Sequence, residues 1–374
     1  MPSVSLKDAR GPLALALDIG SSSVRALCFD LDGRSVAGSE CQIAYALAVT
    51  GDGGVTADAP ALFEIARSCL DGALTKVAAT PCAIACVGVS CFWHSLMGVD
   101  AAGKPTTPVL MYSDTRSADA VSALRRDYDQ RDVHVRTGCV IHSSYWPAKL
   151  RWLRATSPRA VARTAHWQSF AEYALARICG AGPTSVSMAS ATGLLDIRRA
   201  VWDPDALEMA GIDVAALLPI AERTEPLGPI RRALAARWPA LAAAAWYPAL
   251  GDGACANVGV GALSRKRIAL TVGTSGAMRV AVPAPPGAAL TIPEDLWAYR
   301  LDRGSVLLGG AITNGGKVAA WLGDLFAASF DGPAMDAAWA MEPDGHGLTF
   351  LLFLAGERSP IWNDRATGVV AGLT

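Results

Sequence analysis

Two segments far apart in this chain share one pattern of strand, glycine-hydroxyl turn and strand. The first covers residues 15–27 and has the sequence LALDIGSSSVRAL, and the second covers residues 268–280 and has the sequence IALTVGTSGAMRV. A repeat of this kind indicates two halves of related build. We therefore predict that the two turns face each other across a cleft between the halves.

The order of predicted elements around these segments is that of an α/β protein. Apolar patterning predicts strands at 13–19, 24–31, 35–46 and 83–90, with a helix at 59–79 between the last two. Strands that return after a helix are typical of α/β architecture. Further predictions are a helix at 167–178, a loop leading into a strand at 187–196 and a helix at 317–327. We place the domain boundary near Leu250, which gives domains of residues 1–250 and 251–374.

Composition excludes several classes of protein. The formal net charge of −1 gives no support for a nucleic-acid partner. The nine cysteines include no C-x-x-C pair, so a reduced chain is favoured over a disulfide or zinc framework. No apolar run reaches the length of about 18 residues that a membrane span needs, so we expect a cytoplasmic protein without a membrane partner.

The two turns have the chemistry of a phosphate site. Backbone N–H groups and hydroxyls in a glycine turn form a concave site for anions. Asp18, beside the first turn, can hold a hydrated Mg²⁺ that neutralises charge on a transferring phosphate. The absence of a G-x-x-x-x-G-K-[ST] segment excludes a P-loop ATPase, and no G-x-G-x-x-G follows the first strand.

Asp252 is the candidate catalytic residue. It stands between two glycines, shortly before the second turn. That position favours a base that accepts the proton of a hydroxyl during phosphoryl transfer. The alternative is an ordinary turn aspartate that bonds its own backbone.

Aromatic and charged residues follow two predicted strands of the first domain. Trp93 and His94 come after the strand at 83–90, while Asp114 and Arg116 come after a strand at 109–112. Ligand sites in open α/β sheets lie at this end of the strands, so we expect these residues to bind a polyhydroxylated or acidic substrate. A core role for Trp93 and His94, and a structural ion pair between Asp114 and Arg116, remain open as alternatives.

Four motifs in order resemble those of the FGGY carbohydrate kinases, which belong to the actin, hexokinase and Hsp70 ATPase superfamily. They are DIGSSSVR at 18–25, GDG at 251–253, VGTSG at 272–276, and Gly315-Gly316 leading into Trp321. The resemblance covers almost the whole chain. It implies an α/β protein with the two-domain actin-like ATPase (ribonuclease H-like) fold.

Within that family, several segments are most similar to gluconate kinases. They are WHSLM at 93–97, YSDTR at 112–116, SMASATGL at 187–194 and GERSPIW at 356–362. Two positions depart from the usual pattern, since Trp93 replaces a smaller residue and Tyr112 replaces tryptophan. Xylulokinases, which also carry a histidine at the position of His94, are the nearest alternative.

The resemblance implies ATP-dependent phosphorylation of a sugar acid or sugar at a terminal hydroxyl, with gluconate to 6-phosphogluconate as the first choice. Asp252 would take the hydroxyl proton and Asp18 would hold Mg²⁺. The residues implied to contact ATP are Asp18, Ser21, Ser22, Ser23, Arg25, Gly273, Thr274 and Gly316. The residues implied to contact the sugar are Trp93, His94, Asp114, Arg116 and Asp252. The partner is a small molecule, and a homodimer is left open.

Length sets one further expectation. Family members continue beyond this point with a Gly-Gly-Gly-x-x-Ser adenosine motif, and this sequence contains no Gly-Gly-Gly. The second domain is therefore expected to be incomplete, with exposed apolar surface around the last strand. A non-catalytic sugar-binding remnant is the alternative function.

Overall fold

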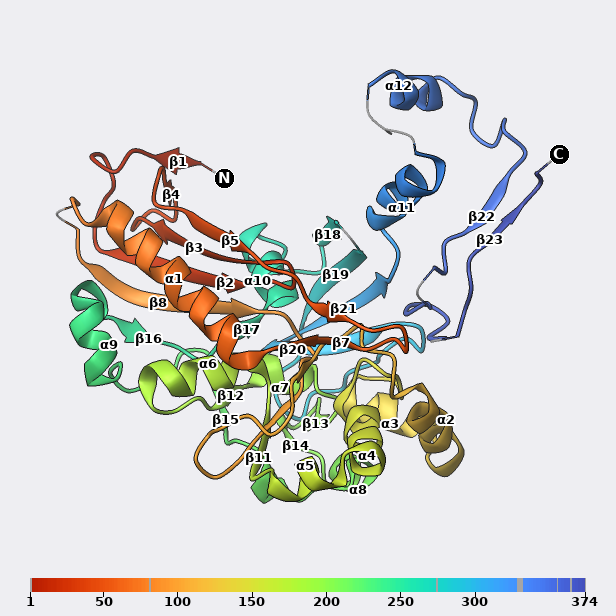
Figure 1. The fold of residues 1–374 in the computed structure, drawn as a ribbon, viewed down its shortest axis with the longest axis horizontal. Coiled ribbons are helices and arrows are strands. Elements are labelled where there is room, and N and C mark those ends of the chain that lie inside the picture. Colours follow the sequence, from red (N-terminus) through yellow and green to blue (C-terminus); the bar gives the residue numbers. More distant parts are fainter. Residues whose placement is uncertain are drawn as a thin grey trace.

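The computed structural model describes residues 2–80, 82–273, 275–327, 332–354, 356–363 and 365–373. Two sheets lie on either side of helix α10 (Asp252–Gly259), and a group of helices and short strands lies below them in Figure 1. The α/β architecture predicted from the order of elements is confirmed. The predicted boundary near Leu250 falls between the two sheets in sequence and remains a prediction.

The first sheet is built around the first turn of the repeat. Its path is β1 (Ser3–Val4), β4 (Ser35–Val36), β3 (Ser23–Phe29), β2 (Leu13–Ile19), β8 (Ile84–Cys91) and β16 (Ala245–Trp246); β5 (Cys41–Ala44) joins β3 and β17 (Leu250–Gly251) joins β8. β2 is antiparallel to β3 and parallel to β8. The carboxyl ends of β2, β8 and β17 therefore meet at one edge, which positions Asp18, His94 and Asp252 near one another.

Helix α1 (Ala59–Val77) lies across the first sheet (Figure 1). It begins where expected because the Asp58 side chain accepts a hydrogen bond of 2.8 Å from Ala61 N. Its apolar stripe, which includes Leu62 and Leu70, is buried against the sheet. The helix thus closes one face of the sheet and leaves the strand ends open.

The second sheet is antiparallel throughout. Its order is β18 (Ile268–Val272), β19 (Gly276–Pro283), β21 (Ser305–Ile312) and β20 (Trp297–Asp302). Helix α11 (Lys317–Phe326) follows β21. The strand at 268–272 and the start of the helix at 317 match the sequence predictions.

Three sequence predictions need correction, and capping or turn residues explain each one. The predicted strand at 35–46 is two short strands, β4 and β5, separated at Gly38, which has a φ of 79°. The predicted helix at 167–178 is strand β11 (His166–Gln168) followed by α6 (Phe170–Cys179), because Ser169 and Glu172 form a capping box. The predicted loop at 187–196 begins with helix α7 (Val186–Ser190), which Ser185 caps.

The remaining elements complete the first half and the end of the chain. The helices are α2 (Ala118–Asp127), α3 (Gln130–Thr137), α4 (Trp146–Thr156), α5 (Pro158–Arg163), α8 (Pro204–Ala210), α9 (Arg232–Arg237) and α12 (Pro333–Trp339). The strands are β6 (Ala48–Val49), β7 (Val55–Ala57), β9 (Met97–Val99), β10 (Val109–Leu110), β12 (Thr184–Ser185), β13 (Leu195–Asp196), β14 (Val201–Trp202), β15 (Ile220–Ala221), β22 (Thr349–Leu351) and β23 (Val369–Ala371). Over the described residues, no helix is long and apolar enough to cross a membrane.

The last part of the chain extends away from the body of the molecule in Figure 1. It comprises α11, α12 and the β22–β23 hairpin. Large apolar side chains here are exposed, including Trp339 at 81% and Leu373 at 75%. The expectation of exposed apolar surface around the last strand is confirmed.

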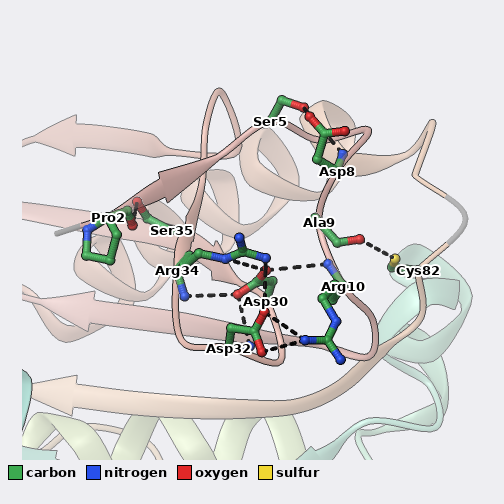
Figure 2. Close-up of polar contacts among 10 residues, drawn as sticks. All are labelled: Pro2, Ser5, Asp8, Ala9, Arg10, Asp30, Asp32, Arg34, Ser35 and Cys82. Carbon is green, nitrogen blue, oxygen red and sulfur yellow. Dashed lines mark hydrogen bonds and ion pairs between the residues drawn. The ribbon is translucent and has the colours of Figure 1, made fainter.

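A buried carboxylate fixes the turn after β3 (Figure 2). Asp30 is 4% exposed and pairs with the Arg34 guanidinium at 2.6 Å. Its Oδ1 also accepts hydrogen bonds from the backbone N–H groups of Asp32 and Arg34. The hydrogen bonds from Arg34 lower the pKa of Asp30 to about 2. This turn holds the outer end of the β2–β3 hairpin, opposite the glycine turn.

Candidate functional site

A cavity of about 670 Å³ lies between the two sheets. Its lining includes residues from both copies of the repeat and from the strand ends of the first sheet. Of the predicted site residues, those in the lining are Asp18, Ser21, Arg25, Trp93, His94, Asp252 and Gly273. The structure therefore brings the predicted base, both turns and part of the predicted sugar site to one cavity.

The two glycine turns are both hairpin turns, but they differ in length. Ile19 pairs with Val24 across the first turn, and Val272 pairs with Gly276 across the second. The first turn therefore has one residue more than the second. The sequence match between the two segments is therefore out of step by one residue after the turns. Arg25 pairs with Asp18 in the first hairpin, and the residue in the equivalent position of the second hairpin is Ala277, which pairs with Thr271.

Asp18 is held by the neighbouring strand. Ser90, beside it on β8, donates a hydrogen bond of 2.8 Å from Oγ to Asp18 Oδ1. On the other side, Asp18 pairs in register with Arg25 on β3. The Arg25 guanidinium forms an ion pair of 3.1 Å with Glu40, so a phosphate would compete with that carboxylate. Asp18 thus presents an oriented carboxylate to the cavity.

The second turn supports the start of α11. Gly316 N donates a hydrogen bond of 2.6 Å to Gly273 O. A Cβ atom at Gly315 would lie 2.8 Å from the backbone of Ser275, and one at Gly316 would lie 2.8 Å from Gly273 O. Only glycines allow this approach.

Three of the predicted phosphate contacts lie in the described part of the chain but are not among the lining residues. Gly316 supports the second turn from outside the cavity lining, and Ser22 and Ser23 of the first turn also lie outside that lining. Thr274 is outside the described residues. Direct phosphate contact by these four residues therefore remains a prediction.

Asp252 is the first residue of α10 and directly follows β17, which pairs with the end of β8. Its side chain keeps accessible surface inside the cavity, but the cavity walls limit how well water solvates the carboxylate. This desolvation raises the pKa of Asp252, while the Gly253 N–H and the charge of Arg279 oppose the rise. The nearby charge of Asp18 raises the pKa further.

Trp93 explains the two glycines that flank the acid. A Cβ atom at Gly251 would lie 1.8 Å from Trp93 Nε1, and one at Gly253 would lie 2.3 Å from Cζ3. The indole also donates a hydrogen bond of 3.2 Å to Ser187 O. The ring is therefore packed against the segment that carries Asp252. Trp93 thus has both of the roles considered from the sequence, since it packs in the core and also lines the cavity.

His94 is strained and neutral. Its φ of 66° is unusual for a histidine, and its Nδ1 lies 2.7 Å from Ala191 O. Because a carbonyl can only accept, Nδ1 carries the proton and Nε2 is left as an acceptor. Burial lowers the pKa of His94 to about 3. The buried Lys149 ammonium holds the backbone in place, since it donates hydrogen bonds to His94 O and Met111 O at 3.0 and 2.8 Å.

Aromatic residues from both halves form one side of the cavity, which we call the aromatic wall. Its members are Trp93, Tyr145, Trp297, Tyr299 and Trp362. The hydroxyls of Tyr145 and Tyr299 are 2.6 Å apart, and Trp297 stacks on Tyr299 with ring centroids 4.1 Å apart. Sequence reasoning found only Trp93 of this set as a site residue, because the others are assembled by tertiary contacts.

Asp114 and Arg116 are not in the cavity lining. They form a bidentate ion pair, with Nη2 2.6 Å from Oδ2 and Nε 3.0 Å from Oδ1. Asp114 also accepts a hydrogen bond from Val55 N, and Arg116 lies 4.6 Å from the centroid of the Trp152 ring. The structural ion pair that was left open accounts for these contacts, and direct sugar contact by the pair remains a prediction.

Arg279 is a cavity residue that sequence reasoning missed. It is 5% exposed, and its guanidinium bonds Asn257 Oδ1 at 2.9 Å and Thr271 Oγ1 at 2.6 Å. A cation on the inward face of a strand beside Asp252 adds to the positive charge available for phosphate. The alternation of side chains along a strand could have identified this residue, because Ala277 and Arg279 lie on the same face of β19.

Comparison with known proteins agrees with this geometry. The sequence model described as "FGGY family of carbohydrate kinases, N-terminal domain" matches residues 13–259. A gluconokinase of Bacillus subtilis (strain 168) is 28% identical over 377 residues, which is 96% of this chain and 71% of that protein. A xylulose kinase of Streptomyces rubiginosus is 29% identical, over 98% of this chain and 71% of that protein.

Solved structures give the same fold. A gluconate kinase from Lactobacillus acidophilus superimposes with a TM-score of 0.87 at 26% identity, over 97% of this chain and 72% of that one. A ligand-bound xylulose kinase from the same organism has the same TM-score, identity and coverage. The actin-like fold predicted from the motifs is thereby confirmed. With its family match over 13–259 and its two turns placed around Asp252, this chain belongs to the FGGY family of carbohydrate kinases.

Proposed function

We propose that this protein transfers the γ-phosphoryl group of ATP to a terminal hydroxyl of a sugar acid, with gluconate as substrate and 6-phosphogluconate as product. The observation that carries the proposal is the single cavity that joins Asp252, both glycine turns and the aromatic wall. Both gluconate and xylulose kinases are among the similar proteins, so a xylulokinase-type sugar kinase is the alternative. A cytoplasmic location and a homodimer stay predictions.

Asp252 acts as the general base in this proposal. Its carboxylate accepts the proton of the terminal hydroxyl as that oxygen bonds to phosphorus and the bond to the leaving ADP breaks. The raised pKa makes the carboxylate a stronger base than a solvated aspartate. Arg279, close enough to Asp252 to affect its pKa, adds positive charge where the transferring group would lie.

The residues present fit a Mg²⁺ ion. Magnesium in kinases takes one or two protein carboxylates, with waters and substrate phosphates as its other ligands. Asp18 supplies such a carboxylate, oriented by Ser90, beside the first turn. When bound, the ion neutralises charge on the phosphates. The backbone of the two turns and the hydroxyl of Ser21 would hold the phosphate oxygens.

The aromatic wall and His94 form the sugar side. Neutral His94 offers Nε2 as an acceptor for a sugar hydroxyl. Rings such as Trp93 supply apolar area against C–H groups and exclude water from the site. Excluding water favours transfer to the sugar over hydrolysis of ATP.

The test is an assay of ADP release with gluconate, with and without Mg²⁺, for the wild type and for Asp252→Asn. We expect kcat to fall by about 10²–10⁴-fold in the variant, the range typical for loss of a general base. Gluconate binding measured by calorimetry should change little. Equal kcat in the two proteins would remove Asp252 from the mechanism, and faster turnover of D-xylulose than of gluconate would favour the alternative.

A further inference from the structure

Arg358 lies at the aromatic side of the cavity and has no role in the mechanism above. It lines the cavity, and its guanidinium carbon lies 5.3 Å from the centroid of the Tyr112 ring. Its charge influences the pKa values of His94, Tyr145 and Tyr299. Arg358 is therefore the cation that the sugar side of the cavity presents to a ligand.

The guanidinium of Arg358 is only partly satisfied within the protein. Its Nε is buried and has no hydrogen-bond partner, while Nη2 has one long contact of 3.4 Å with Ile312 O. The neighbouring Glu357 carboxylate instead accepts hydrogen bonds from the backbone N–H groups of Thr313 and Arg358. Among the described residues, no acid forms an ion pair with this guanidinium.

A guanidinium with so few partners in a cavity wall gains from a ligand that accepts hydrogen bonds from its terminal nitrogens, since the buried Nε itself is shielded from the cavity. The two carboxylates in the cavity lining, Asp18 and Asp252, belong to the strand ends beside the glycine turns. The positive charge of Arg358 is therefore not neutralised on its own side of the cavity. A ligand group that suits this position is anionic and accepts more than one hydrogen bond.

We propose that Arg358 binds the carboxylate of an open-chain sugar acid and so selects acids over neutral sugars. This inference rests on the proposed function, which places the accepting hydroxyl at Asp252. In an aldonic acid the carboxylate and the terminal hydroxyl are at opposite ends of the chain. A carboxylate is ionised at neutral pH and matches the planar fork of a guanidinium. Binding at Arg358 then presents the far end of the same molecule to Asp252.

Calorimetric titration of the full chain without nucleotide tests this inference separately from catalysis. The ligands are D-gluconate and D-glucitol, which differ in having a carboxylate or a hydroxymethyl group at one end. The proteins are the wild type, Arg358→Gln, Arg358→Lys and the control Arg265→Gln. Arg265 is an exposed arginine in the turn before β18. Circular dichroism and thermal melting establish that each variant is folded.

We expect the wild type and Arg265→Gln to bind gluconate equally and more tightly than glucitol. Arg358→Gln should bind gluconate about 10–100-fold more weakly, the range for a lost charge-assisted hydrogen bond, with little change for glucitol. Arg358→Lys, which keeps the charge but not the fork, should fall between them. Equal gluconate affinity in the wild type and in a folded Arg358→Gln overturns the inference, as does a wild type that prefers glucitol. If Arg358→Gln still releases ADP from ATP in the presence of gluconate, with an unchanged KM for gluconate, this inference alone is overturned and the proposed function stands.

Discussion

The indole of Trp93 lies against Gly251, so closely that a Cβ atom at this glycine would come within 1.8 Å of Nε1. The same ring blocks a Cβ at Gly253. The acid between these glycines is therefore fixed by a ring that also lines the cavity. This contact couples the position of the proposed base to the sugar side of the site.

Gly251→Ala should consequently destabilise the protein. The added methyl group must displace Trp93, and overpacking of this kind costs about 1–3 kcal/mol. Urea unfolding should show a lower midpoint, and gluconate should bind more weakly because the ring has moved. Gly88→Ala is the matched control, since a Cβ at this glycine of β8 meets nothing within 4 Å. If both variants unfold at the same midpoint, the proposed contact does not constrain the segment.

Asp252→Asn should make the folded state more stable at neutral pH while it lowers kcat. The folded-state pKa of Asp252 is raised by desolvation, so the ionised form is disfavoured in the folded protein. The free energy of unfolding therefore decreases as the pH rises from the unfolded pKa of about 3.9 towards the higher pKa of the folded state. Thermal melting of the two proteins at pH 7 should give the higher Tm for the asparagine variant. A lower Tm would show that the ionised carboxylate has a stabilising partner.

Ser90→Ala should weaken magnesium binding more than it affects folding. Loss of the Ser90 Oγ hydrogen bond leaves Asp18 without the group that orients it. Groups of this type typically change metal affinity by about 10–100-fold. Titration of activity with Mg²⁺ should show a higher half-saturating concentration and a nearly unchanged gluconate KM. The contrary result is an unchanged magnesium dependence, which would place the ion elsewhere.

Asp30→Asn should change how the stability of the fold depends on pH in acid, and it should leave the residues of the cavity in place. The pKa of Asp30 is lowered to about 2 by Arg34, so its stabilising contribution is present above the unfolded pKa of about 3.9. That contribution is lost as the pH falls from about 4 to about 2. The variant should be less stable than the wild type at pH 7, and the two should converge towards pH 2. Parallel stability curves over that range would argue against the ion pair in Figure 2.

The repeat and the acid between the turns were predictable because both depend on local sequence. A glycine turn between strands has a short-range signature, and the strands at 13–19 and 268–272 begin and end as expected. The helix at 170–179 was less accurate because Ser169 separates it from a short strand, and apolar spacing alone does not detect a cap.

The rest of the cavity could not be predicted, because it is assembled by long-range packing. Tyr145 and Tyr299 meet although 154 positions separate them, and neither belongs to a motif. Arg358 stands in a segment noted for its similarity to gluconate kinases, yet its unpartnered Nε is visible only in three dimensions. The charges of Asp114 and Arg116 did not identify cavity residues, because two opposite charges close in sequence can form an ion pair with each other.

The hydrogen bond between the Tyr145 and Tyr299 hydroxyls has a mechanical consequence. It joins the N-cap residue of α4 to the second sheet at one end of the cavity, while the two glycine turns belong to separate hairpins. Two parts of a protein that are joined on one side of a cavity can move apart more easily on the opposite side. We therefore expect any change in the distance between the turns to involve the smallest movement at the aromatic wall and the largest displacement where the turns would hold phosphate.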